Sequence, residues 1–147
     1  MTAPSYVHGT SDVPLLGETI GENLRRTVER FPDREALVVP YQGYRASYRQ
    51  FWEQTSLAAQ GLIGRGVKKG DRVGIWSPNR WEWAVTQYAT ARVGAVLVNV
   101  NPAYRLHELE HVLKQSGTSL LLVAKGFRQA NYVEMVREAA QRCPEHR

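Results

Sequence analysis

GDRVGIWSPNRWEWAVTQYATARVGAVLVNVNPAYRLHELE, residues 70–110, is the stretch that decides the fold of this chain. Its first part, residues 71–76, is a short run of β-branched and aromatic side chains. The run stops at Ser77-Pro78, which is typical of a buried strand that ends in a loop. We therefore predict a strand at the start of this stretch.

A helix and a second strand are predicted to follow. Residues 81–93 contain no helix breaker, and we expect Asn79 to cap this helix and Gly94 to end it in the left-handed conformation. In the strand predicted over residues 95–100, four apolar side chains follow one another without alternation: Ala95, Val96, Leu97 and Val98. Such a run predicts that both faces of the strand are covered, as in a parallel sheet flanked by helices.

The flanking sequence extends the same pattern in both directions. Capping boxes formed by Thr19 with Glu22 and by Ser47 with Gln50 predict two helices, over residues 20–31 and 48–63. The second helix is expected to bury one face, made of Tyr48, Phe51, Trp52, Thr55, Ala58, Ala59, Leu62 and Ile63. Further predictions are a hairpin of residues 36–39 and 44–47, helices over 106–115 and 131–142, and a strand over 119–123. The predicted fold class is α/β, with a mostly parallel sheet flanked by helices.

The domain organisation predicted from this pattern is simple. Residues 1–16 contain Pro4 and Pro14 and are expected to form a flexible polar arm, and residues 17–147 form one partial domain. The helix of residues 81–93 is apolar nearly all round, so it requires cover. That cover comes either from other parts of this chain or from missing sequence. If it is absent, an exposed aromatic patch favours self-association.

Composition excludes several classes of protein. The chain is 43% hydrophobic and 22% charged, which is typical of a globular protein, and its one cysteine, Cys143, excludes an internal disulfide. We expect Cys143 to be an inert packing residue and the protein to be cytoplasmic. The net charge of +5 is scattered among acidic neighbours, so nucleic-acid binding is not predicted. No apolar run approaches the roughly 20 residues that span a bilayer.

The sequence resembles the N-terminal part of the adenylate-forming acyl-CoA synthetases, the AMP-binding ligase superfamily. The match extends over residues 15–145 and includes residues 19–38 and Tyr48. The residues that carry it most clearly are Gly70-Asp71-Arg72-Val73-Gly74-Ile75, Asn79 with Trp81 and Glu82, Gly94-Ala95, residues 99–104, Glu108-Leu109 and Ser116-Gly117. These are framework motifs that occur in members acting on different acids, so the resemblance does not indicate a substrate.

The parts of the family that handle nucleotide are absent from this sequence. No segment matches the phosphate loop T-S-G-T-T-G-x-P-K, because the segment from Ser116 to Ser119 lacks its paired glycines and its lysine. The adenine-binding segment, the ribose-binding aspartate and the catalytic lysine are missing as well. We therefore expect a truncated portion with no catalytic residue and no cofactor site of its own. ATP, magnesium and CoA are implied for the full-length enzyme alone.

One group of polar residues follows a predicted strand at its carboxyl end, where ligands gather in open α/β sheets. Asn99, Asn101, Pro102 and Tyr104 could line a pocket in the parent enzyme, or they could simply shape the turn. Three tryptophans, Trp76, Trp81 and Trp83, are expected to be packing residues rather than part of an acyl tunnel.

A short motif points to different chemistry. The segment from His107 to His111 reads HELEH and matches the H-E-x-x-H zinc helix of metalloproteases, for which Glu134 or Glu138 would be the third ligand. The apolar residues of the predicted helix lie opposite both histidines, which favours a structural surface helix without a metal.

The resemblance implies a function for the whole enzyme. It would activate a small-molecule carboxylic acid, as a fatty-acid-CoA ligase does in fatty acid metabolism. The acid and ATP would form an acyl-adenylate and pyrophosphate, and CoA would then displace AMP. We expect the 147-residue chain alone to be inactive. The alternative is a non-catalytic module that acts in interaction or dimerisation.

Overall fold

The computed structural model describes residues 9, 12, 13 and 15–142. The predicted arm of residues 1–16 lies largely outside the described residues, and Cys143 lies wholly outside them. The elements in chain order are α1 (Ile20–Arg30), β1 (Glu35–Val39), η1 (Pro40–Gln42), β2 (Tyr44–Ser47), α2 (Tyr48–Gly64), β3 (Arg72–Trp76), α3 (Trp81–Val93), β4 (Val96–Val100), α4 (Leu106–Ser116), β5 (Leu120–Val123), β6 (Gly126–Phe127), β7 (Ala130–Asn131) and α5 (Tyr132–Arg142).

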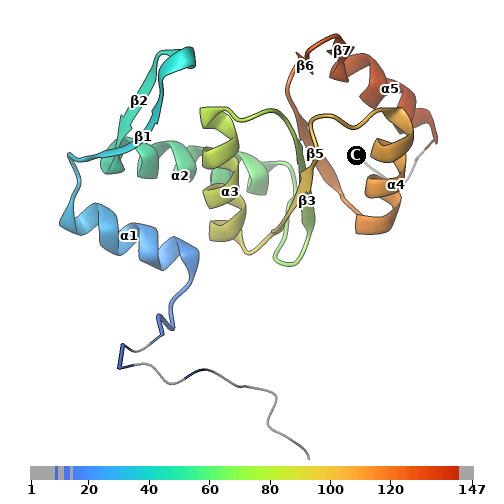
Figure 1. The fold of residues 1–147 in the computed structure, drawn as a ribbon. Coiled ribbons are helices and arrows are strands. Elements are labelled where there is room, and N and C mark those ends of the chain that lie inside the picture. Colours follow the sequence, from blue (N-terminus) through green and yellow to red (C-terminus); the bar gives the residue numbers. More distant parts are fainter. Residues whose placement is uncertain (1–8, 10–11, 14, 143–147) are drawn as a thin grey trace, which may run out of the picture.

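The main sheet has three parallel strands in the order β4-β3-β5, which confirms the predicted fold class. Arg72 pairs with Val96 on one side of β3, and Val73 pairs with Leu120 on the other side. The chain moves from β3 to β4 in one direction and then crosses β3 to reach β5. Right-handed crossovers in opposite directions place their helices on opposite faces. Accordingly, α2 and α3 cover one face and α4 and α5 the other (Figure 1).

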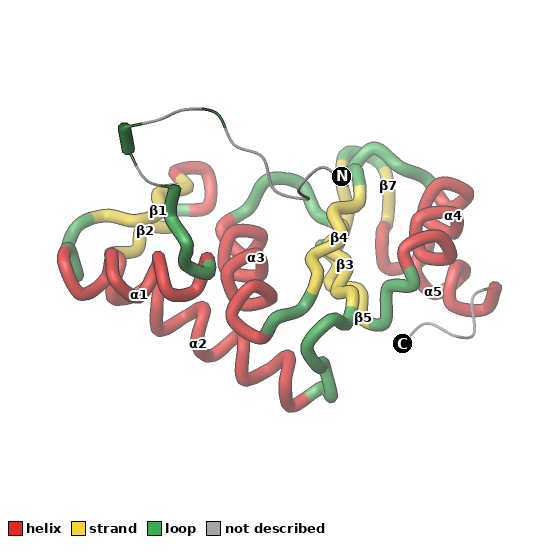
Figure 2. The backbone as a smooth tube through the Cα atoms, turned by 90° about the horizontal axis from the view of Figure 1, so that it is seen from below, coloured by secondary structure: helices red, strands yellow, loops and turns green. Residues whose placement is uncertain are grey.

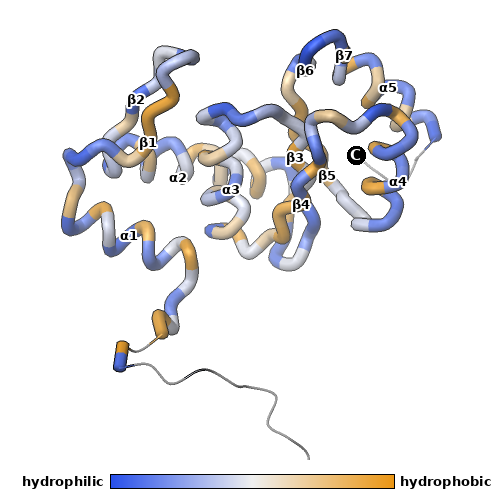
Figure 3. Tube along the Cα trace, viewed as in Figure 1, coloured by the Kyte–Doolittle hydropathy of each residue, from blue (hydrophilic) through white to orange (hydrophobic). Residues whose placement is uncertain are grey.

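The central strand β3 separates two layers of core. Val73 packs with Leu62 of α2 and Ala89 of α3 on one face. Trp76 packs with Leu109 of α4 and Tyr132 of α5 on the other. The hydrophobic colour in Figure 3 lies along β1 and the parallel strands, and the connecting loops are more hydrophilic. The fold is therefore organised around one strand that is buried on both faces.

A third core cluster joins the N-terminal elements to α3. Leu24 of α1, Ala46 of β2, Phe51 of α2 and Val85 of α3 are buried together. Both predicted capping boxes are present, with Thr19 capping α1 and Ser47 capping α2. The predicted hairpin is also confirmed, since β1 and β2 pair antiparallel.

The start of α3 differs from the prediction. Asn79 does not cap the helix; Arg80 occupies the N-cap position and makes no side-chain capping bond. Instead, the backbone N–H of Trp81 donates to the side-chain oxygen of Gln42 at 2.9 Å. The cap therefore comes from the turn of the β1–β2 hairpin. The predicted end of α3 is confirmed, because Gly94 has a φ of 73°.

Two predictions of burial are wrong in part. Val96 of β4 is 52% exposed, because β4 is an edge strand within the described part of the chain. Ile63, predicted on the core face of α2, is 60% exposed at the end of that helix. The short β6–β7 hairpin was not predicted, because its turn contains Arg128 at a φ of 54° and no glycine.

The cover that α3 requires comes from this chain. Its principal neighbour is α2, and α1 and β1 also pack against it. Val85, Ala89 and Thr90 are buried, and most of its other side chains are partly buried. Among the described residues, no helix combines the length and the apolar character needed to span a membrane.

The fold makes a prediction for Trp76. Its side chain is fully buried, stacks on Tyr132 with ring centroids 3.8 Å apart, and donates from Nε1 to the carbonyl of Asn101 at 3.0 Å. We expect Trp76→Phe to lower the free energy of unfolding by about 1–3 kcal/mol, because it leaves a cavity and removes one of the two hydrogen bonds that the Asn101 carbonyl accepts, the other coming from the N–H of Tyr104. Urea unfolding followed by circular dichroism measures this change. Trp83→Phe is the matched control, and equal losses in the two variants would contradict the role given to Trp76.

Candidate functional site

A cavity lies at the carboxyl ends of β3 and β5. After β3 the chain turns to α3 on one face of the sheet, whereas after β5 it turns to β6, β7 and α5 on the other (Figure 2). Open α/β sheets bind ligands where successive connections diverge in this way. The cavity has a volume of about 450 Å³ and is lined by Ile75, Ser77, Arg80, Glu82, Trp83, Thr86, Leu122, Val123, Ala124, Lys125 and Gly126.

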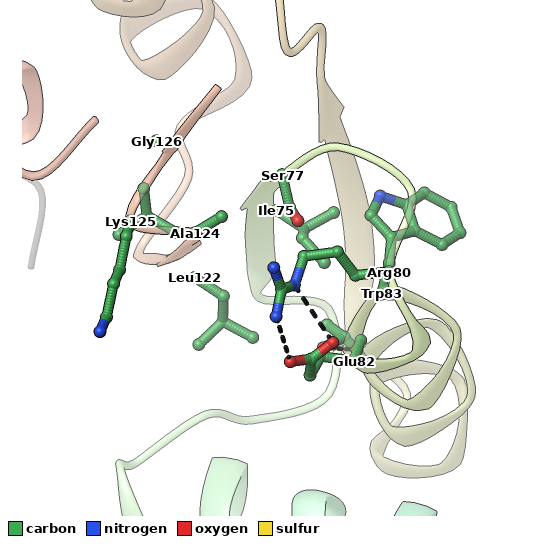
Figure 4. Close-up of a pocket in the computed structure, with 11 residues that line it drawn as sticks. Ile75, Ser77, Arg80, Glu82, Trp83, Leu122, Ala124, Lys125 and Gly126 are labelled. Carbon is green, nitrogen blue, oxygen red and sulfur yellow. Dashed lines mark hydrogen bonds and ion pairs between the residues drawn. The ribbon is translucent and has the colours of Figure 1, made fainter. Parts of the chain in front are cut away.

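One wall of the cavity carries an ion pair. The Nη2 of Arg80 lies 3.0 Å from Oε1 of Glu82, and Nε of Arg80 lies 3.3 Å from Oε2 (Figure 4). Gln42 donates to the same carboxylate at 3.0 Å. The side chain of Gln42 therefore holds both the first helical N–H of α3 and the carboxylate of the next residue.

The electrostatics of this pair keep it ionised. Burial raises the pKa of Glu82, but the hydrogen bonds from Arg80 and Gln42 outweigh it and hold that pKa below its ordinary value. The hydrogen bond to Glu82 raises the pKa of Arg80. Since the two charges cancel, this wall offers polar groups without a net charge.

The opposite wall carries a positive charge. Lys125 is the second residue after the end of β5, and it forms no ion pair with a described carboxylate. Leu122 lies between Lys125 and the Arg80–Glu82 pair (Figure 4), and Ile75 adds a second apolar side chain to the lining. The lining includes no histidine and no cysteine, and the Ser77 hydroxyl donates to the carbonyl of Pro78 at 2.8 Å. The cavity is therefore suited to holding an apolar ligand with an anionic group, not to nucleophilic catalysis.

Three of the four residues predicted to line a pocket, Asn101, Pro102 and Tyr104, lie in a turn beside α5, where the N–H of Tyr104 donates to the carbonyl of Asn101 at 3.0 Å. The Asn101 side chain accepts from the N–H of Ala103 at 2.9 Å, and the carbonyl of Pro102 accepts from the Tyr132 hydroxyl. Tyr104 packs against the core cluster of α4 and α5, and Asn99 is exposed on β4. None of the four lines the cavity between β3 and β5. A pocket role for them in a larger protein stays a prediction.

The H-E-x-x-H segment lies on α4 with both histidines exposed and Leu109 fully buried. The two glutamates have other partners. Glu108 accepts from the backbone N–H of Arg105 at 3.0 Å, and Glu110 pairs with Arg142 at 3.0 Å. Within the described ranges, no three histidine, cysteine, aspartate or glutamate side chains are grouped to hold a metal ion. These contacts fit the structural surface helix.

Of the three tryptophans expected to be packing residues, two pack against other aromatic rings and one lines the cavity. Trp76 lies in the core, and Trp81 stacks on Tyr44 with ring centroids 4.7 Å apart. Trp83 lines the cavity. Arg80 and Lys125 were not predicted as site residues. The signal that could have found them is their place after two adjacent parallel strands, which is the rule that led to Asn101.

Comparison with known proteins gives the context of this site. The family described as AMP-binding enzyme matches residues 24–147. The mitochondrial medium-chain acyl-CoA ligase of Danio rerio is 43% identical over 141 residues, which cover 96% of this chain and 23% of that protein. The corresponding ligase of Homo sapiens is also 43% identical over 141 residues, 96% of this chain and 22% of its own length. The chain thus spans less than a quarter of the curated relatives it matches.

Solved structures also include an acyl-CoA synthetase whose chain this sequence matches in part. A fatty acyl-CoA synthetase of Mycobacterium tuberculosis superposes with a TM-score of 0.70 at 31% identity, covering 71% of this chain and 21% of that one. A luciferase-like enzyme of the mealworm Zophobas morio superposes with a TM-score of 0.75 at 18% identity, over 87% of this chain and 30% of its own. That second likeness supports the fold alone.

The Arg80–Glu82 pair makes stability depend on pH. Because the folded-state pKa of Glu82 is lowered, its ionised form stabilises the fold above the pKa of an unfolded glutamate. This contribution is lost as the pH falls through the lower folded-state pKa. We expect Glu82→Gln to cost less than about 1 kcal/mol at neutral pH, since the pair is partly exposed. The difference in free energy of unfolding between Glu82→Gln and the parent chain should shrink below roughly pH 4.3.

Urea unfolding at a series of pH values measures this difference. Glu53→Gln, which removes an exposed carboxylate of α2 that forms no ion pair with a described cation, is the matched control. A Glu82→Gln difference that stays constant from neutral to acidic pH would contradict the stabilising role of the ionised pair.

Proposed function

The chain belongs to the AMP-binding enzyme family, and from this membership we propose that it is the N-terminal part of an acyl-CoA ligase. The observation that carries the proposal is its 43% identity to medium-chain acyl-CoA ligases over 96% of its length. The whole protein would convert a carboxylic acid, ATP and CoA into acyl-CoA, AMP and pyrophosphate.

We propose a medium-chain fatty acid as the substrate. The Danio rerio and Homo sapiens relatives are medium-chain acyl-CoA ligases, which supports this choice, as does the fatty acyl-CoA synthetase among the similar structures. A cavity with an apolar floor and a lysine at its edge is compatible with an amphipathic acid. The cytoplasmic location stays a prediction, and the mitochondrial location in the names of these relatives is the competing one.

The proposed reaction proceeds in two balanced steps. A carboxylate oxygen bonds to the α-phosphorus of ATP while the bond from that phosphorus to the oxygen that bridges to the β-phosphate breaks. This step releases pyrophosphate and gives the acyl-adenylate. The sulfur of CoA then bonds to the acyl carbon, AMP leaves, and the thiol proton is released. Division into two steps gives the thiol an activated acyl group to attack.

The residues of this chain do not fit the groups that handle ATP and magnesium. The sequence has no phosphate loop of the family's form, and the described residues include no acidic cluster for a metal ion. We therefore assign no step of the reaction to a residue of this chain. Its proposed contribution is the framework: the parallel strands, their covering helices and the cavity at their carboxyl ends.

The proposal predicts a contrast between two proteins. The 147-residue chain should give no carboxylate-dependent exchange between ATP and pyrophosphate, because it lacks the phosphate loop and the catalytic lysine. A longer product of the same gene should give exchange and form acyl-CoA, with a maximum at medium chain length. Radioactive exchange and loss of free CoA thiol, measured with saturated acids of increasing length, test both.

Intact mass of the endogenous product decides which protein to assay. A mass several times 16.7 kDa supports the ligase, whereas a mass near 16.7 kDa favours the alternative of a non-catalytic module. Exchange by the short chain above background would overturn its predicted inactivity. A longer product that activates no acid would overturn the ligase proposal.

A further inference from the structure

A second cavity lies away from the sheet, between the N-terminal end of α1, the middle of α2 and the C-terminal end of α3. It has a volume of about 450 Å³, and its lining includes Gly21, Glu22, Arg25, Trp52, Lys69 and Arg92. In Figure 1 the N-terminal end of α1 lies beside the end of α3 that carries Arg92. This cavity shares no lining residue with the cavity between β3 and β5.

Arg92 is held in this cavity by hydrogen bonds and a ring contact, without a countercharge. Its Nη1 donates to the carbonyl of Trp52 at 3.2 Å, to the hydroxyl of Thr55 at 2.9 Å and to the hydroxyl of Ser56 at 2.8 Å. The guanidinium also lies 3.7 Å above the ring of Trp52. All these partners are neutral, and burial lowers the pKa of Arg92. Among the described residues, none accepts a hydrogen bond from its Nε or Nη2.

Two glycines bring the charged side chains close to the helix ends. A Cβ on Gly21 would lie 3.2 Å from Cγ of Arg92, and a Cβ on Gly94 would lie 3.0 Å from Cγ of Lys69. The stems of both cations therefore pack against backbone, which restricts where their charged groups can go. Arg92 and Lys69 are thus brought to one cavity by close packing from two different parts of the chain.

The lining carries an excess of positive charge. Arg25, Lys69 and Arg92 face a single carboxylate, Glu22. That carboxylate accepts from the N–H of Thr19 at 2.9 Å and from its hydroxyl at 2.8 Å, so it is occupied by the capping box. Arg25 has an exposed partner in Glu29. Neither Lys69 nor Arg92 forms an ion pair with a described carboxylate.

Two helix ends of opposite polarity lie at the cavity. The N-terminus of α1 carries partial positive charge. The C-terminus of α3 would oppose it, but its carbonyls are partly occupied: Thr90 accepts from Ala95 at 3.0 Å, and Gly94 accepts from Gly70 at 2.8 Å. The balance of fixed charge and dipole therefore favours an anion.

We propose that this cavity binds the phosphate group of a small molecule. The free edge of the Arg92 guanidinium offers two N–H donors that match two oxygens of one phosphate. Lys69 supplies a second positive charge, which suits a dianion better than a monoanionic carboxylate. The cavity is larger than inorganic phosphate, so the remainder of the molecule would lie over Trp52.

The test uses the ¹⁵N-labelled 147-residue chain and two probes, inorganic phosphate and pyrophosphate, with acetate as the carboxylate comparison. We expect both probes to shift the amide resonances of Gly21 and Gly94 and the Nε resonance of Arg92. Lys69→Gln should weaken phosphate binding by about 3–10-fold, because it removes one of two unpaired charges. Lys68→Gln is the matched control, since it removes the same charge from the adjacent exposed residue outside the cavity.

Arg92→Lys provides a second variant, because it keeps the charge but removes the paired N–H donors. We expect weaker phosphate binding there too, with urea unfolding as the measure of any purely structural loss. Equal weakening by Lys68→Gln and Lys69→Gln would overturn the proposal, since it would indicate general attraction to a basic protein. Acetate binding as strong as phosphate binding, or no shift at Gly21 and Gly94, would overturn it as well.

Discussion

The requirement that β3 be covered on both faces determines the arrangement of this protein. Val73 needs apolar partners on one side of the strand and Trp76 needs them on the other. Because one layer of helices can cover only one face, the chain has to place α2 and α3 on one side and α4 and α5 on the other. The divergence of the chain after β3 and β5 is a consequence, and it opens the cavity between Arg80 and Lys125. Core packing and the position of the candidate site therefore have one cause.

Much of this arrangement could be predicted from the sequence, because the signals are local. The capping boxes at Thr19 and Ser47 and the terminal Gly94 each depend on residues within a few positions, and all three were predicted correctly. The features that were predicted wrongly or not at all depend on residues far apart in the sequence. The cap of α3 is supplied by Gln42, and no local pattern around Asn79 could indicate it. The site required both the strand order and the direction of each crossover, so Lys125 could not be assigned from its own neighbours.

The two cavities differ in the kind of chemistry that surrounds them. Between β3 and β5, the charge of Arg80 is cancelled by Glu82 and the floor is apolar. Between α1 and α3, Arg92 donates from Nη1 to neutral oxygens alone and has no countercharge. An arginine that is paired with a carboxylate has its charge neutralised, so it mainly helps to orient neighbouring groups by hydrogen bonds. An arginine held by hydroxyls and carbonyls keeps a charge that can attract an anion.

The contact between Gln42 and α3 has a consequence for how the chain folds. Gln42 lies in the turn between β1 and β2, and it reaches a helix whose first residue is Trp81. Neither element completes its hydrogen bonds until the other is in place, and the stacked rings of Tyr44 and Trp81 reinforce the same dependence. The hairpin and the first turn of α3 should therefore open and close as one cooperative unit in native-state hydrogen exchange. Because that unit joins segments far apart in sequence, it raises the contact order of the chain and slows the folding of its N-terminal half.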